Sequence, residues 1–128
     1  MTCGQTDPRE ERGAAASLRF AVRAGEFVPF HRVTSGECWT HTGGDPLQLH
    51  LIHADGVYEL CTLAAQESVF IGGGTLRAAR LAPGGRSAEC VRDPAGGDAP
   101  AVVDVPPARE ILRQHPLHEP IVSALTLG

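Results

Sequence analysis

Turn-forming residues divide the chain into short segments, and this division constrains the fold more than any other feature. Extended character is expected over residues 17–23, 27–33, 37–42, 47–53, 57–63, 68–71, 76–81 and 87–91. The breaks between the segments carry glycine, proline or aspartate, as at Gly25, Pro46, Gly56 and Gly84. Short strands at such regular spacing predict a sandwich or barrel of the jelly-roll kind.

Apolar and polar residues alternate within several segments, as in half-buried strands. Residues 47–53 alternate leucine with other residues, among them His50. Glu37, Trp39 and His41 share one face of their strand, because side chains two residues apart point the same way. The faces of His41 and His50 stay open at this point, since a one-residue slip exchanges the two faces of a strand.

The two ends of the chain differ from this pattern. Residues 1–15 are rich in charge, glycine and alanine, and we expect a disordered lead there, before a single domain over residues 16–128. After Pro106 and Pro107 the apolar period becomes helical, which predicts one or two short C-terminal helices. A chain of 128 residues is long enough to bury one core.

Charge and hydropathy exclude several classes of partner. The formal net charge is −4 at pH 7 and no basic run is present, so nucleic acid is not an expected partner. No apolar stretch approaches the length of a membrane span, and residues 1–12 lack the apolar core of a signal peptide. We therefore expect a cytoplasmic protein without a membrane partner.

Four residues stand at the spacing of the first cupin motif, G-x5-H-x-H-x3-E-x6-G. They are Gly25, His31, Glu37 and Gly44. Val33 occupies the place of the second histidine. The second motif, G-x5-P-x-G-x2-H-x3-N, is matched at its central glycine, Gly74, but Arg77 replaces its histidine. The register of the first motif resembles that of the cupins.

One branch of the cupins is more similar still, a family of small bacterial and fungal proteins of unknown function. Its members read like GEFSAFHRVKSDEIWHFHAGDPLEL, where this chain has GEFVPFHRVTSGECWTHTGGDPLQL over residues 25–49. The resemblance covers residues 17–92 and 107–125. It implies a mainly β fold, a cupin-type jelly-roll β-barrel with a short C-terminal helix or helices. Small cupins usually dimerise by sheet extension, so the resemblance also implies a homodimer.

The resemblance raises the question of a metal centre, since metal-binding cupins hold their ion with three histidines and a glutamate. Val33 cannot bind a metal, and Arg77 brings a permanent positive charge to the place of a ligand. We therefore expect no metal and no other cofactor. The alternative is a retained metal site built from His31, Glu37 and either His41 or His50.

Acid–base chemistry needs no metal. Arg77 could pair with Glu37 or bind a substrate carboxylate or enolate, and its charge would lower the pKa of Glu37. His31 is then the expected proton-transfer residue, with Glu37 holding its tautomer. Besides these three catalytic candidates, the expected substrate-binding residues are Trp39, His41 and His50. A structural ion pair of Glu37 and Arg77, closing one end of the barrel, is an equally open interpretation.

Two hypotheses of function follow, and both give the chain a small-molecule partner. The first is a metal-independent enzyme that isomerises, epimerises or cyclises a small carbonyl-bearing metabolite, by analogy with metal-free cupin-fold deoxysugar epimerases and cyclases. All its basic residues are arginine, a composition that would suit a natural-product pathway. The second hypothesis is a non-catalytic module that binds a small ligand inside the barrel.

Overall fold

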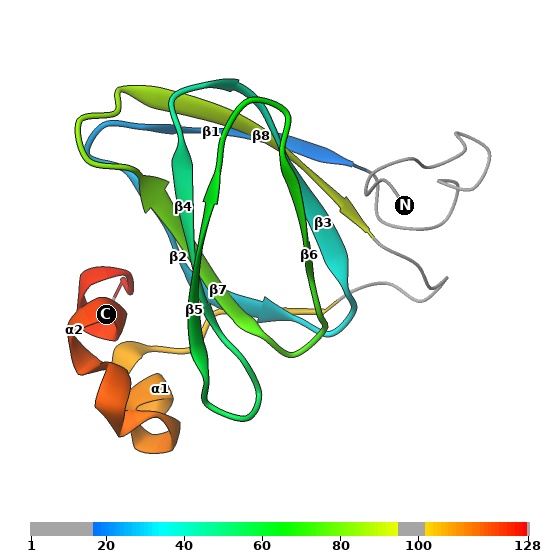
Figure 1. The fold of residues 1–128 in the computed structure, drawn as a ribbon. Coiled ribbons are helices and arrows are strands. Elements are labelled where there is room, and N and C mark those ends of the chain that lie inside the picture. The colour runs from blue at the N-terminus through cyan, green and yellow to red at the C-terminus, as the bar shows by residue number, and fades with distance from the viewer. Residues whose placement is uncertain (1–16, 95–101, 128) are drawn as a thin grey trace.

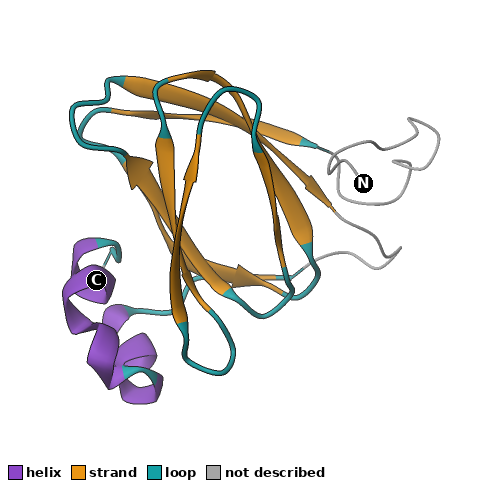
Figure 2. Cartoon of the chain, viewed as in Figure 1, coloured by secondary structure: helices purple, strands orange, loops and turns teal. Residues whose placement is uncertain are grey.

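The computed structural model describes residues 17–94 and 102–127, so the expected disordered lead over residues 1–15 lies outside the described residues. The strands are β1 (Leu18–Arg23), β2 (Phe27–Val33), β3 (Glu37–Gly44), β4 (Leu47–Ile52), β5 (Tyr58–Leu63), β6 (Ser68–Ile71), β7 (Leu76–Leu81), β8 (Ser87–Pro94) and β9 (Val103–Asp104). The helices are α1 (Ala108–Gln114), the 3-10 helix η1 (Pro116–His118) and α2 (Glu119–Ala124). The predicted mainly β chain with short C-terminal helices is confirmed (Figures 1 and 2).

The strands form two antiparallel sheets that face each other (Figure 1). One sheet has the order β1-β8-β3-β6, and the other has the order β5-β4-β7-β2-β9. Neighbouring strands are mostly distant in sequence, as in jelly rolls. No hydrogen-bonded pairing joins the two sheets among the described residues, so the jelly roll is a sandwich rather than a closed barrel.

Three strands differ from the prediction by two residues or more, among them β3, which continues to Gly44 instead of ending at residue 42. β8 continues to Pro94 instead of ending at residue 91, because its last residues pair with the start of β3, where Glu37 stands opposite Pro94. β9 is not predicted by alternation, since it has only two residues, which pair with Arg32 and Val33 at the end of β2.

The apolar core has two parts, one on each face of the five-stranded sheet. The part between the sheets includes Val22, Trp39, Leu47, Leu49, Leu51, Ile71 and Cys90. The part between the five-stranded sheet and the helices includes Phe30, Ile52, Ala78, Ile111, Val122 and Leu125. The backbone N–H of Phe30 also donates to the carbonyl of Leu125, with an N···O distance of 2.9 Å. The helices therefore cover the outer face of this sheet, which buries both of its faces.

Gly44, the last glycine of the first motif, is required by the backbone. Its φ is +82°, a left-handed value, and a Cβ added there would lie 2.3 Å from the carbonyl oxygen of Ser87. Only glycine combines this conformation with so close an approach. Part of the motif thus encodes the fold rather than the chemistry.

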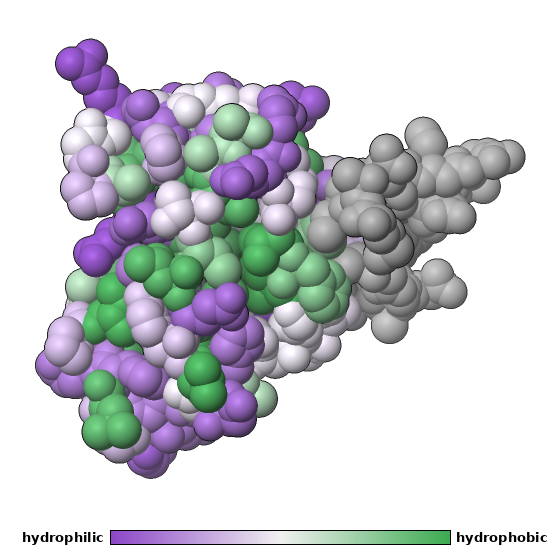
Figure 3. Space-filling view, in the orientation of Figure 1, coloured by the Kyte–Doolittle hydropathy of each residue, from purple (hydrophilic) through white to green (hydrophobic). Residues whose placement is uncertain are grey.

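β5 and β6 are edge strands, and both carry exposed apolar side chains. Leu60 on β5 and Phe70 on β6 are exposed, and Figure 3 shows apolar residues gathered over this side of the molecule. Unpaired edges are the places where sheets extend into a second chain. The homodimer stays a prediction. No helix in the described part of the chain is long and apolar enough to cross a membrane.

Candidate functional site

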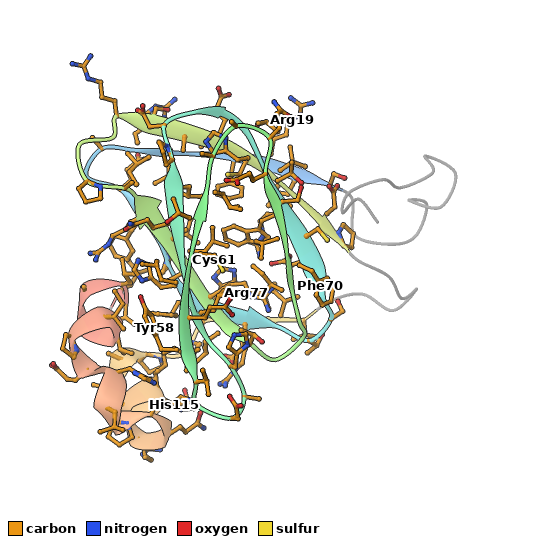
Figure 4. All side chains as sticks on the ribbon, in the orientation of Figure 1. Arg19, Tyr58, Cys61, Phe70, Arg77 and His115 are labelled. Atoms are coloured by element: carbon orange, nitrogen blue, oxygen red, sulfur yellow. The ribbon has the colours of Figure 1, made fainter. Side chains whose placement is uncertain are left out.

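Four polar side chains from four strands meet between the two sheets. They are His31 on β2, Glu37 on β3, Arg77 on β7 and Arg92 on β8. Strand register brings them together, because His31 stands opposite Arg77 and Arg92 stands opposite Trp39. Figure 4 shows Arg77 between the sheets. The three predicted catalytic candidates therefore lie in one cluster, together with a fourth residue.

Arg77 is fully buried and anchored by the backbone next to it. Its Nε and Nη2 both donate to the carbonyl of Thr75, at 3.1 and 2.9 Å, and Nη2 also donates to the carbonyl of Gly72 at 3.0 Å. Its Nη1 donates to Oε1 of Glu37 at 2.8 Å. With most of its N–H groups occupied in this way, Arg77 fastens the β6–β7 turn to Glu37. This geometry matches the structural ion pair better than a residue aimed at a ligand.

Glu37 offers a single carboxylate oxygen to three donors. Its Oε1 accepts hydrogen bonds from Trp39 Nε1 at 2.8 Å, Arg77 Nη1 at 2.8 Å and Arg92 Nη2 at 2.6 Å. Burial acts to raise the pKa of Glu37, but the hydrogen bonds from Arg92 and Trp39 and the charges of both arginines outweigh it and lower the pKa below its ordinary value. Glu37 is thus held as a carboxylate and is a weak base.

His31 is held as a neutral imidazole of defined tautomer. Its Nδ1 lies 2.9 Å from the carbonyl oxygen of Pro29, which can only accept, so Nδ1 carries the proton. Its Nε2 accepts from Arg92 Nη2 at 2.9 Å. Burial, together with the charges of Arg92 and Arg77, lowers the pKa of His31 to about 4. The expected contact in which Glu37 holds the tautomer is not formed, because Arg92 lies between the two side chains and Pro29 takes that role.

Arg92 is not among the residues predicted from the sequence. Its side chain is 17% exposed, and its guanidinium carbon lies 4.7 Å from the ring centre of Trp39. Its Nε and Nη1 have no hydrogen-bond acceptor within residues 17–94 and 102–127. Alternation along β8 would have placed Arg92 on the inner face with Cys90, had the predicted strand continued past residue 91.

The three predicted substrate-binding residues lie in different places. Trp39 is fully buried beneath Arg92 and donates to Glu37. His41 is also buried, but its Nε2 lies 2.7 Å from the carbonyl oxygen of Asp45, which ties it to the β3–β4 turn. The cluster thus includes Trp39, whereas His41 is bonded elsewhere.

His50 does not join the cluster. It projects from the opposite face of the five-stranded sheet, where its Nδ1 lies 2.6 Å from the hydroxyl of Tyr58. The inward positions of β4 belong to its leucines, and His50 stands opposite Ala78, which packs against the helices. The structure therefore does not support the prediction that His50 binds substrate in this site.

The donor set does not fit a divalent metal ion. The described residues hold no group of three His, Cys, Asp or Glu side chains arranged to bind one. Val33 is buried on the face of β2 that His31 occupies, and two guanidinium cations lie against the carboxylate of Glu37, where their charge would repel a metal ion. The alternative metal site fails on the same geometry, because His41 and His50 point elsewhere.

Among the described residues, the cluster carries one positive charge more than its acidic groups balance. Arg77 and Arg92 are cations, Glu37 is a carboxylate and His31 is neutral. The next acidic side chain on β8, Asp93, follows Arg92 directly and so points to the other face of its sheet, where the hydroxyl of Ser17 donates to it. Such a cluster can attract and hold an anion.

Among the surface depressions of the described residues, two lie at the β1–β2 turn, away from this cluster. One is lined by residues at the β1–β2 turn, from Ala21 to Val28. The other lies between that turn, the β7–β8 turn and the end of α2 at Leu125. Neither is lined by His31, Glu37 or Arg92, and neither brings titratable groups together as the cluster does.

Solved structures with the same fold are similar to this chain at low sequence identity. A hypothetical protein from Leishmania major has a TM-score of 0.72 and 20% identity, covering 88% of this chain and 76% of its own. A protein from Shewanella oneidensis has a TM-score of 0.72 and 20% identity, covering 98% of this chain and 83% of its own. A TDP-quinovose 3,4-ketoisomerase from Campylobacter jejuni has a TM-score of 0.53 and 12% identity, covering 65% of this chain and 63% of its own. These similarities establish the fold alone.

Sequence comparison assigns the family. No curated protein matches this chain. The family described as Cupin superfamily (DUF985) matches residues 2–95, which is most of the chain. The register of Gly25, His31, Glu37 and Gly44 lies inside that match, and the jelly roll agrees with it. The chain therefore belongs to the DUF985 family of the cupin superfamily.

Proposed function

We propose that this cupin binds a small carboxylate-bearing metabolite between its two sheets without a metal ion. The observation that carries the proposal is that Arg77 and Arg92 share one carboxylate oxygen of Glu37. Within residues 17–94 and 102–127 one positive charge is left over in a partly buried place, where charges interact more strongly than in water. A bound carboxylate would neutralise it.

Arg92 is the residue that would contact the ligand. Its side chain reaches solvent, and its Nε and Nη1 are free of acceptors among the described residues. Nε and Nη1 lie on different edges of the guanidinium, and the Nη2 group common to both edges is occupied by Glu37 and His31, so a carboxylate would accept a single charge-assisted hydrogen bond from Nε or from Nη1. Arg77, which is fully buried, would hold Glu37 in place from behind.

The surroundings of Arg92 hold its guanidinium in one orientation before a ligand arrives. Glu37 and His31 both accept from its Nη2, and Trp39 lies under its plane. A cation held in this way loses little conformational freedom on binding. The neutral state of His31 adds no second positive charge that would compete for the anion.

Trp39 provides a direct test, because it is the single tryptophan of the chain and lies against both Arg92 and Glu37. Sodium acetate, titrated at constant ionic strength against sodium chloride, is expected to change its fluorescence in a saturable way. Arg92→Gln should abolish the change. Arg86→Gln, which alters an exposed arginine on another loop, should leave it intact. A response that survives Arg92→Gln, or no saturable response, refutes the proposal.

A second candidate function is proton transfer on the bound molecule. It is favoured by the fixed tautomer of His31, which leaves Nε2 unprotonated, and Nε2 would exchange its hydrogen bond from Arg92 for the substrate proton. A carboxylate bound to Arg92 would offset one of the charges that lower the pKa of His31. Isomerisation, epimerisation or cyclisation of a carbonyl-bearing metabolite would then use Arg92, rather than Arg77, beside the substrate. The ketoisomerase of similar fold is an analogy, since one fold hosts many chemistries.

Solvent exchange separates the two candidates. In D2O, 2-oxobutanoate is expected to exchange its protons next to the carbonyl faster with the protein than with buffer, as measured by proton NMR. His31→Gln should remove the acceleration while leaving acetate binding at Arg92 measurable through Trp39. Binding of 2-oxobutanoate without accelerated exchange would contradict catalysis and favour a purely binding protein.

A further inference from the structure

We infer that the ligand of this site is a monocarboxylate with an apolar body. This inference rests on the proposed function, because it assumes that a carboxylate binds Arg92. It adds the class of molecule, and it separates that class from dicarboxylates, phosphates and sugars. Two independent features of the cluster carry it, its charge and the side chains on either side of Arg92.

The charge of the cluster fits one negative charge. Arg77 and Arg92 contribute two positive charges, and Glu37 removes one of them. A monocarboxylate brings the sum to zero. A dicarboxylate or a phosphate dianion would leave an uncompensated negative charge near Glu37, in a place that is shielded from water.

The strand neighbours of Arg92 are apolar. Arg92 pairs with Leu18 on β1 and with Trp39 on β3, so the three side chains project from the same face of their sheet. Leu18 is 57% exposed, whereas Trp39 is fully buried. A molecule bound to Arg92 therefore meets an open apolar surface at Leu18. Neither neighbour can accept hydrogen bonds from the hydroxyl groups of a sugar.

The facing sheet contributes a second exposed apolar side chain. Val103 on β9 pairs with Val33, which shares the inner face of β2 with His31. Val103 is 58% exposed, so apolar side chains reach solvent on both sheets at this end of the sandwich. An isolated exposed leucine or valine is ordinary. Here Leu18 pairs with Arg92 itself, and Val103 pairs with Val33, which lies two residues from His31, so the polar groups are flanked by apolar side chains as in ligand sites.

The test compares four probes on the full chain by titrating the fluorescence of Trp39 at constant ionic strength: acetate, hexanoate, succinate and inorganic phosphate. Each buried methylene improves affinity by up to about fourfold. Hexanoate is therefore expected to bind at least about tenfold more tightly than acetate, if two or more of its methylenes are buried. Succinate and phosphate should bind more weakly than hexanoate.

Variants test whether the higher affinity for hexanoate depends on Leu18 and whether binding depends on Arg92. Leu18→Ser should lower the affinity for hexanoate severalfold and leave that for acetate unchanged, whereas Leu117→Ser, at an exposed leucine of η1, should change neither. Arg92→Gln should abolish the binding of all four probes. Arg92→Lys keeps the charge without the guanidinium N–H groups and should give intermediate affinities. Circular dichroism of each variant confirms that it is folded.

The outcomes separate the two proposals. Suppose that Arg92→Gln abolishes binding, but that hexanoate binds no more tightly than acetate, or that succinate or phosphate binds most tightly. The proposal of an apolar monocarboxylate is then wrong, whereas the proposed anion site is supported. The same holds if Leu18→Ser leaves the affinity for hexanoate unchanged. If no probe binds, or if Arg92→Gln and Arg92→Lys change nothing, the anion site itself is wrong and the inference falls with it.

Discussion

Replacing Arg77 by methionine tests whether this arginine is the anchor of the cluster. The change removes a fully buried guanidinium and the hydrogen bonds that it donates to Glu37, to Thr75 and to Gly72. Methionine fills much of the same volume, so a large cavity contributes little to the result. The expected loss comes from polar groups that remain buried without a partner.

The size of the loss in unfolding free energy depends on which hydrogen bonds the former partners of Arg77 retain. The carbonyl of Gly72 still accepts from the N–H of Thr75, at 3.3 Å, and Glu37 still accepts from Arg92 and Trp39. The carbonyl of Thr75 loses both of its bonds from Arg77. Breaking a buried ion pair costs about 3–5 kcal/mol. Because Glu37 keeps two hydrogen-bond donors, we expect Arg77→Met to lower the unfolding free energy by about 3 kcal/mol, the lower end of this range.

Urea unfolding followed by far-UV circular dichroism measures this cost. Arg92→Gln serves as the comparison and should cost only about 1 kcal/mol, because Arg92 is partly exposed and Glu37 keeps its bond from Arg77. In the double variant Glu37→Gln with Arg77→Met, the loss should be smaller than the sum of the single losses by about 0.5–3 kcal/mol. A loss below about 1 kcal/mol for Arg77→Met, or additive losses, would refute the structural role and return Arg77 to the ligand-binding residues.

Three further predictions concern other parts of the molecule. The free energy of unfolding should decrease as the pH falls from 6.5 to 4. The pKa of histidine in the unfolded chain is near 6.5, whereas burial lowers the pKa of His31 and of His50 to about 4 in the folded chain. The unfolded chain therefore binds more protons in this pH range, and each of the two histidines lowers the stability by on the order of 2–3 kcal/mol. His50→Phe should flatten part of this dependence in urea titrations at several pH values, and an unchanged slope would contradict the assignment. Gly44→Ala should lower the melting temperature more than Gly84→Ala. Both residues have a left-handed φ, but only at Gly44 would the added Cβ lie against the backbone of Ser87. Equal shifts would contradict a cost from this close contact. Dialysis against EDTA should leave the melting temperature and the acetate titration unchanged, whereas a drop in either would show that a metal contributes.

The sequence by itself determined the architecture and part of the site. Regular turn residues predicted the jelly roll, and the motif included Gly44, whose left-handed φ only the structure shows. The motif register placed His31 and Glu37, and the same register placed Arg77 where a metal ligand belongs in other cupins. These predictions depend on local spacing, which a single sequence displays directly.

The inner and outer faces of the five-stranded sheet were decided only by tertiary packing. The helices cover its outer face, so residues on both faces of β4 are buried. Alternation separates His50 from the leucines but does not show which of the two faces borders the site. The position of Arg92 depends on the pairing of β8 with β3, between residues 55 positions apart in the case of Arg92 and Glu37. That pairing makes Arg92 the contact between His31 and Glu37. Cross-strand register sets which charges meet, and it arises from long-range packing that no local pattern contains.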